Sequence, residues 1–441
     1  MSDPSNGDVR MRGFTQRSSV SAALHWLDQQ LFALGEESLP LASCSGRVLA
    51  RDLVSSYDLP RFPRAMMDGI AIQSRETLGA DPLHRIRFEM IADSLPGRGC
   101  LLRVQKGEAV RIMTGAPMPE GADAVMPVER VTFESHLVWV QEEISAGKNV
   151  ALPGEDVAKG SVVLNAGRML RPQDLGLLSS LGNDCVPVCS QPRVAMVVTG
   201  NELLPPGTPP RDFQVADANS PMLRALVNRD GGIISGCQLI ADDPQRIHEA
   251  LLADADVVLV TGGSSVGQED YAPGLLARHG ELAIHGIAMR PGGPTGMGTL
   301  EGRLVFLLPG NPVSCLCAYD FFAGRAIRSL GGRSKAWPYS SVRCRLDREL
   351  DSAEGRVDYV RVRIVPGNAD AADREPHVEP LFASGGSMVS SATQADGFVV
   401  VPAASRSLAA GSLVVVHRYD HPWQQEGTAS FPVGEVSDRD R

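Results

Sequence analysis

The sequence predicts a multidomain α/β protein in which a doubly wound parallel sheet lies between β-rich regions. The chain has 441 residues, which is more than one compact core usually holds. Over residues 191–332, three apolar runs alternate with helical patterns, and each run ends in a glycine-containing turn. On both sides of that region, over 61–155 and 340–420, glycine and proline punctuate short β-like runs.

The composition indicates a soluble globular protein and argues against several classes of function. Hydrophobic residues make up 43% of the chain and charged residues 21%, and the net charge of −10 argues against a nucleic-acid-binding surface. No segment has the ~18 consecutive apolar residues of a membrane helix, and the N-terminus lacks an apolar secretory core. The eight cysteines are not spaced as zinc ligands. We therefore expect a cytoplasmic protein with free thiols that binds neither nucleic acid nor membranes.

The N-terminal half is expected to contain one helix followed by a small β-rich domain. Residues 1–15 are polar and are expected to be disordered. Over 18–34, apolar residues recur at helical spacing, and Ser18 is a suitable N-cap. The β-like runs of the domain that follows are 87–91, 109–113 and 137–140.

The central region alternates strands and helices. Its buried-strand candidates are 194–198, 257–260 and 304–308, and its helix candidates are 220–229, 244–253 and 312–329. Such alternation implies right-handed crossovers and a parallel sheet with helices on both faces. Asn311 and Pro312 suit the N-cap and the first position of the last helix. After Pro338 the β-like alternation returns, as in 359–364 and 412–417.

The turn after the second buried strand is the first candidate site. Gly262 and Gly263 allow the chain to turn sharply. The small residues that follow offer backbone N–H groups and hydroxyls to an anion, and they are Ser264, Ser265 and Gly267. Ligands of doubly wound sheets bind beyond the carboxyl ends of the strands, where the other two glycine-containing turns also lie. Taken alone, this stretch is equally compatible with a glycine-rich turn that binds no ligand.

Seven segments, taken as an ordered set, resemble the molybdopterin molybdenumtransferases, including the E domain of gephyrin. The segments are DLPRFPRAMMDGIAI (58–72), RIMTGAPMPEGADAVM (111–126), KNVALPGEDVAKG (148–160), TGNE (199–202), GGSSVGQEDY (262–271), MRPGGP (289–294) and LPGNPVS (308–314). The resemblance runs from about residue 17 to about residue 420, and its motifs are specific as a set.

The resemblance implies a subunit of four domains. These are a linker domain (16–59 and 157–190), an inserted β-rich domain (60–156), a molybdopterin-binding α/β domain (191–337) and a C-terminal β domain (338–425), followed by a flexible tail (426–441). The family forms homodimers, in which the cleft lies between the α/β domain of one subunit and the inserted domain of the other. It uses Mg²⁺ to insert molybdate into adenylylated molybdopterin and releases AMP. A molybdopterin adenylyltransferase and client molybdoenzymes are the further partners expected.

The resemblance also implies roles for individual residues. The catalytic positions are Asp68, Thr114, Asp156 and Arg290, of which the first three would face the partner's cleft. The cofactor-binding positions are Gly262, Gly263, Ser264, Ser265, Gly267, Pro291, Gly292, Asn311, Pro312 and Ser314. The Mg²⁺ ligands would be Glu202, Asp242 and Asp270, because carboxylates at one sheet edge can hold a hard cation.

The chain departs from the family pattern mainly at cationic positions. Ala151 stands where the family usually has an arginine, and Gly286 and Gly293 stand where it usually has lysines. Asn201 replaces an acid. Because molybdate and phosphate are anions, each lost charge-assisted contact would weaken capture by roughly 1.5–3 kcal/mol. Arg290 is the cation that could compensate in part.

Three functions therefore remain open from the sequence. The first is an active molybdenumtransferase with a remodelled anion site. The second is a non-catalytic paralogue that binds or carries the cofactor. The third and most remote is a molybdopterin adenylyltransferase, because that family shares a similar α/β domain, although the full-length match argues against it.

Overall fold

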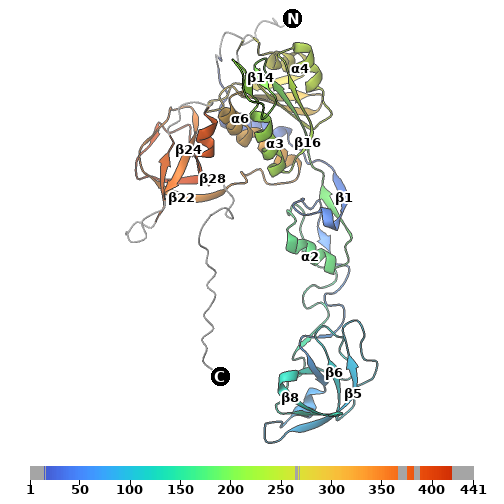
Figure 1. Cartoon of the computed structure of the whole chain (residues 1–441). Helices are drawn as coiled ribbons and strands as arrows, with labels where there is room; N and C mark the ends of the chain where they lie inside the picture. The colour runs from blue at the N-terminus through green and yellow to red at the C-terminus, as the bar shows by residue number, and fades with distance from the viewer. Residues whose placement is uncertain are drawn as a thin grey trace. The chain divides into compact units, whose positions relative to one another are not determined.

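A computed structural model describes residues 14, 16–263, 267, 269–365, 375–381 and 388–419 (Figure 1). The chain divides into two compact units, one made of Met1–Gly35 and Cys189–Arg441 and the other of Glu36–Val188. The expected disordered N-terminus, apart from Phe14, and the expected flexible tail (426–441) lie outside the described residues. None of the described helices combines the length and the apolar character of a membrane span. All eight cysteines are free, as predicted.

The first unit is built on a six-stranded sheet in the order β16-β13-β17-β21-β20-β18. These strands are Ile233–Ile240, Arg193–Thr199, Val257–Thr261, Arg303–Leu308, Gly296–Leu300 and Glu281–His285. The first four are parallel, as predicted, whereas β20 runs antiparallel to both of its neighbours, β21 and β18. The antiparallel edge arises because β20 and β21 are joined by the two-residue turn Glu301-Gly302, in which both residues have positive φ, as in hairpin turns.

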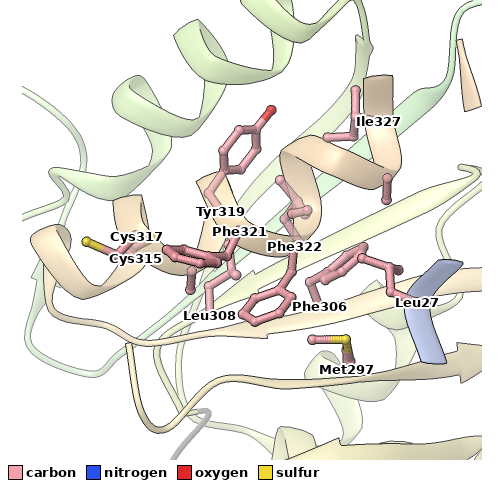
Figure 2. Close-up of a cluster of buried hydrophobic side chains, with 14 of the residues drawn as sticks. Leu27, Met297, Phe306, Leu308, Cys315, Cys317, Tyr319, Phe321, Phe322 and Ile327 are labelled. Atoms are coloured by element: carbon pink, nitrogen blue, oxygen red, sulfur yellow. The ribbon is translucent and has the colours of Figure 1, made fainter. Parts of the chain in front are cut away.

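Helices cover both faces of this sheet. Alternate strand residues point to opposite sides, so Met196, Leu259 and Phe306 join one core and Val197, Val260 and Leu307 join another. The first core contains α1 (Val20–Gln30), α3 (Asn219–Asp230), α6 (Pro312–Ala318) and α7 (Gly324–Leu330), and the second contains α4 (Pro244–Leu251) and α5 (Ala272–His279). Figure 2 shows part of the first core, in which Leu27 of α1 and Phe306 of β21 lie near Phe322. The doubly wound prediction is confirmed.

The first helix differs from its prediction in two respects. Its N-cap is Ser19, whose hydroxyl accepts from Ala22 N at 3.1 Å, and not Ser18. Ser18 instead pairs through its backbone with the segment around Ile287. In addition, α1 packs into the α/β core, because Val20, Ala23 and Leu27 are buried there. Of the linker residues expected at 16–59, those before residue 36 therefore belong to the first unit.

The C-terminal part of the first unit is a closed sheet. Strands β24, β25, β22, β28 and β26 pair in that order, and β26 pairs with β24, which leaves no open edge among them. Their bounds are Val357–Val365, His377–Pro380, Ser340–Leu346, Leu413–Arg418 and Gly397–Val401. The short strand β19 (Met289–Arg290) comes from the α/β domain and pairs with β24. The segment that carries Arg290 is therefore held between two domains of the same unit.

The second unit contains the β-rich domain and the short elements that connect to it. The sheet order is β7-β4-β6-β5-β9-β8, with bounds Ala124–Pro127, Gly69–Ile72, Glu108–Ile112, Ile86–Ser94, Leu137–Val140 and Val131–Glu134. The chain enters and leaves this domain side by side, because β3 (Arg64–Ala65) pairs with β10 (Val150–Ala151) and Leu59 bridges Val157. The connecting part consists of α2 (Pro172–Ser180) and the pairs β1–β12 (Glu36–Pro40, Cys185–Cys189) and β2–β11 (Leu53–Val54, Val162–Leu164).

Candidate functional site

Three glycine-containing turns meet where β13, β17 and β21 end. Gly262 follows β17 with φ 86°, and a Cβ atom there would overlap the carbonyl oxygen of Thr199, the last residue of β13. A Cβ atom at Gly310, after β21, would lie 3.5 Å from the Cα of Gly262. The turns approach so closely that the middle one requires glycine. Ligands of doubly wound sheets bind at this edge.

Asn219, which the sequence reasoning missed, holds this edge together. It is buried at the start of α3, and its side-chain Nδ2 donates to Thr261 Oγ1 and to Gly310 O, both at 2.7 Å. The Asp217 carboxylate accepts from Asn219 N at 2.8 Å and from Ser220 N at 3.0 Å, which fixes the helix start. An aspartate at 217, just before the predicted helix, was the sequence signal that could have located this residue.

The loops after β13 and β16 are joined by reciprocal hydrogen bonds. Asn201 N donates to Asp242 Oδ2 at 3.1 Å, and Asp242 N donates to Asn201 Oδ1 at 3.2 Å. Asn201 Nδ2 also donates to Glu269 Oε2 at 3.5 Å. A carboxylate at position 201 could not donate to Glu269 and would add a negative charge beside Asp242. The departure from the family pattern at Asn201 thus suits its acidic neighbours.

Asp242 has a perturbed pKa because of its surroundings. Burial raises the pKa of its carboxyl above the ordinary value, and the hydrogen bond from Asn201 N opposes that rise. The negative charges of Glu202 and Asp270 raise the pKa of Asp242 further. Asp270 is itself oriented by Gly267 N, which donates to its Oδ2 at 2.6 Å. The three predicted metal ligands are therefore electrostatic neighbours at one edge.

These acids suit a cation without forming a complete cage. Within the described ranges, no three acidic, histidine or cysteine side chains converge closely enough to hold a metal ion by themselves. Their oxygen atoms are nevertheless the donors that Mg²⁺ prefers, and a cation would relieve the repulsion that raises the pKa of Asp242. Glu202, Asp242 and Asp270 fit a Mg²⁺ ion that keeps water or substrate oxygens as its remaining ligands. Their assignment as metal ligands stays a prediction.

The turn after Arg290 lies against the start of α6. Gly292 has φ 104°, and a Cβ atom there would lie 3.0 Å from the Met289 side chain and 3.5 Å from Ser314 O. Two of the predicted cofactor-binding segments, Pro291–Gly292 and Asn311–Ser314, are thereby neighbours. Asn311 and Pro312 occupy the predicted N-cap and first helical positions, although the Asn311 side chain makes no capping bond. Arg290 is exposed and forms no ion pair with a described residue.

In the second unit, Asp68 and Thr114 form a hydrogen-bonded pair. Thr114 donates to Asp68 Oδ1 through its backbone N–H and through its hydroxyl, each at 2.7 Å. The backbone bond, followed by the hydroxyl bond, lowers the pKa of the exposed Asp68 carboxyl. Gly69 fixes the start of β4 beneath this pair, since a Cβ atom there would overlap the carbonyl oxygen of Met126.

The other predicted site residues are placed less directly. Asp156 is exposed, and its backbone N–H donates to Leu59 O at 3.0 Å. None of its side-chain contacts joins it to Asp68 or Thr114 among the described residues. Ser264 and Ser265 lie outside the described residues.

Three known sequence families match successive parts of this chain. Residues 18–182 match the MoeA N-terminal region (domains I and II), residues 195–329 match a probable molybdopterin-binding domain, and residues 343–419 match the MoeA C-terminal region (domain IV). The third match covers the closed sheet of the C-terminal domain.

Individual proteins agree with these matches. A molybdopterin molybdenumtransferase of Staphylococcus aureus (strain MRSA252) is 32% identical over 399 residues, which cover 90% of this chain and 94% of that protein. Molybdopterin molybdenumtransferase 2 of Mycobacterium tuberculosis (strain H37Rv) is 34% identical over 334 residues, or 74% of this chain and 82% of that protein. The crystal structure of the molybdopterin biosynthesis MoeA protein of Pyrococcus horikoshii OT3 superimposes with a TM-score of 0.76 at 29% identity, and covers 92% of this chain and all of that one.

Proposed function

The chain belongs to the molybdopterin molybdenumtransferase family, and on that premise we propose that it inserts molybdate into adenylylated molybdopterin with Mg²⁺ and releases AMP. The observation that carries the proposal is that the acids lie beside the glycine turns: a Cβ atom at Gly263 would lie 3.9 Å from Asp242 Oδ1, and the charges of Glu202 and Asp270 reach the Asp242 carboxyl and raise its pKa. An acidic edge of this kind needs a cation before it can accept a phosphate, and an adenylylated substrate brings phosphates to it.

Different residues of the edge would bind the metal ion, the phosphate and the oxyanion. Glu202, Asp242 and Asp270 would hold Mg²⁺, which supplies positive charge for the phosphates that leave with AMP. The turn at Gly262–Gly263 offers a backbone without side chains, so a phosphate can approach closely. Arg290 supplies a guanidinium that can bind an oxyanion with two N–H groups.

The Asp68–Thr114 pair would serve the cleft of a second subunit. Both residues are exposed, and several apolar side chains in the same segments are exposed around the motif, namely Phe62, Met66, Met67 and Met113. Apolar side chains that gather on a surface favour a protein contact. A homodimer in which these residues meet the partner's α/β edge would bury them. A sedimentation experiment that finds a fully active stable monomer would contradict this arrangement.

The direct test of the function is turnover by the purified protein. Adenylylated molybdopterin, molybdate and Mg²⁺ are supplied together, and AMP is measured by chromatography. We expect AMP release that depends on both the oxyanion and the divalent cation. Reactions without molybdate or without Mg²⁺ are the matched controls. AMP release that depends on neither molybdate nor Mg²⁺ would exclude the proposed reaction.

The carrier function is the second candidate, because Ala151, Gly286 and Gly293 supply no charge to the anion site. A carrier would retain bound molybdopterin or finished cofactor and would release no AMP in the same assay. The set of three family matches favours the transferase over a molybdopterin adenylyltransferase, since two of them lie outside the shared α/β domain. The adenylyltransferase and client enzymes as partners stay predictions.

A further inference from the structure

The residues before α1 form an arm that lies along the Arg290 turn. We call Phe14 and residues 16–18 the N-terminal arm. Ser18 N donates to Gly286 O at 3.0 Å, and Ala288 N donates to Ser18 O at 2.8 Å. The Phe14 ring packs edge-to-face against His285, with 5.0 Å between ring centroids. The arm is therefore held by backbone and ring contacts to the segment that leads into the turn.

The arm fills the space of one missing side chain. Gly286 is buried with φ 86°, and a Cβ atom there would lie 2.5 Å from the Phe14 ring. Any side chain at position 286 would have to displace Phe14 and would also adopt a strained backbone conformation. The loss of a cation at this position is thus coupled to the docking of the arm.

The arm also brings a positive charge to the turn. A Cβ atom at the buried Gly293 would lie 3.2 Å from Met289 O and 3.7 Å from Arg17 Nη1. Arg17 is exposed, and its guanidinium lies 5.7 Å from the centre of the Phe14 ring, which orients it by a cation–π contact. Among the described residues, neither Arg17 nor Arg290 forms an ion pair. Both guanidinium groups are therefore available to an anion at the turn.

We infer that Arg17 is an anion-binding residue, which together with Arg290 holds a tetrahedral oxyanion at the turn Pro291–Gly293. The inference rests on the proposed function, because the oxyanion would be molybdate or a phosphate of the adenylylated substrate. A guanidinium offers two parallel N–H donors to such an anion, whereas a lysine offers a point charge. A second cation at this turn, beside Arg290, thus comes from the N-terminal arm, which is far from the turn in the sequence.

Charge removal at Arg17 tests the inference on the full-length protein. Arg17→Gln should weaken binding of sodium molybdate, measured by calorimetry, by about tenfold or more, which is the expectation for one charge-assisted contact. Arg343→Gln, which removes an exposed arginine from β22, is the control for net charge and should leave the affinity unchanged. Gly293→Lys in the Arg17→Gln background should recover part of the affinity, because Gly293 is not among the positive-φ glycines.

A second variant separates the charge of the Arg17 guanidinium from its orientation. Phe14→Ala retains Arg17 but removes the ring that orients it, so we expect a smaller loss of molybdate affinity than in Arg17→Gln. Binding of adenylylated molybdopterin without molybdate is measured in parallel. A loss confined to that ligand would identify the substrate phosphate as the anion and still support the inference.

The outcomes distinguish this inference from the proposed function. A wild type that releases no AMP, combined with weaker molybdate binding in Arg17→Gln, would refute the transferase and support the role of Arg17. If Arg17→Gln matches Arg343→Gln for both ligands, the inference is overturned, whether or not the wild type releases AMP.

Discussion

Two aspartates, one in each unit, have pKa values shifted in opposite directions, and the difference reflects the surroundings of each carboxyl. Asp242, at the α/β edge, has a raised pKa because it is half-buried and lies near the negative charges of Glu202 and Asp270. Asp68, in the β-rich domain, has a lowered pKa because Thr114 donates two hydrogen bonds to it. Hydrogen bonds therefore outweigh desolvation for the Asp68 carboxylate, whereas the hydrogen bond from Asn201 N to the Asp242 carboxylate does not offset its burial and the neighbouring negative charges. We propose that Asp242 belongs to a site that a bound cation completes.

The largest expected effect concerns the glycine turn that accompanies Asp242. Gly263 has φ 55°, and a Cβ atom there would lie 2.9 Å from Thr199 Oγ1. Gly263→Val should abolish measurable binding of adenylylated molybdopterin, because the branched side chain meets both strain and a close neighbour. Gly274→Ala, in open space on α5, is the matched control and should bind normally. If the Gly263→Val protein folds and binds adenylylated molybdopterin normally, this loop is a turn that does not contact the ligand.

A smaller effect is expected when one acid of the α/β edge loses its charge. Asp270→Asn should raise the Mg²⁺ concentration needed for half-maximal AMP release by about tenfold or more, since an amide oxygen is a weaker ligand. The melting temperature should change little, because the amide oxygen can still accept from Gly267 N. If the Mg²⁺ dependence of AMP release is unchanged in Asp270→Asn, Asp270 is not a ligand of the metal ion.

Charge removal at Arg290 should have a comparable or smaller effect, directed at the anion. Arg290→Ala should raise the molybdate requirement for turnover by about tenfold and leave the Mg²⁺ requirement unchanged. Arg290→Lys keeps the positive charge but loses the two parallel N–H donors of the guanidinium. Its molybdate requirement should lie between those of the wild type and Arg290→Ala. Turnover with unaltered molybdate dependence in Arg290→Ala would mean that the anion binds elsewhere.

The smallest effect is expected at the other aspartate. Thr114→Val removes the hydroxyl donor but keeps the backbone N–H, so the pKa of Asp68 should rise part of the way to its ordinary value. A lowered carboxyl pKa contributes stability above the unfolded-state pKa, and this is lost as pH falls through the folded-state pKa. The variant should therefore lose that contribution at a slightly higher pH. Carboxyl NMR titration measures the shift, with Thr114→Ser as the control that retains the donor.

Sequence patterns located the strands with long apolar runs and the acids that follow them. They did not locate β16, because an edge strand with Ser235, Gly236 and Gln238 has no continuous apolar run. They located the acidic edge, since parallel strands present their carboxyl ends together. They could not reveal that Asn219 bonds to Thr261 and Gly310, or that Arg17 lies beside Gly293, because these contacts join segments far apart in the chain.

The most direct test of the central claim is the titration of both aspartates with and without Mg²⁺. Carboxyl NMR of protein carrying ¹³C-labelled aspartate is recorded over pH, with Asp242→Asn and Asp68→Asn used to assign the signals. We predict that Mg²⁺ lowers the raised pKa of Asp242, because a bound cation favours the carboxylate, and leaves the pKa of Asp68 unchanged. A pKa of Asp242 that does not respond to Mg²⁺ would contradict the assignment of the α/β edge as the cation site.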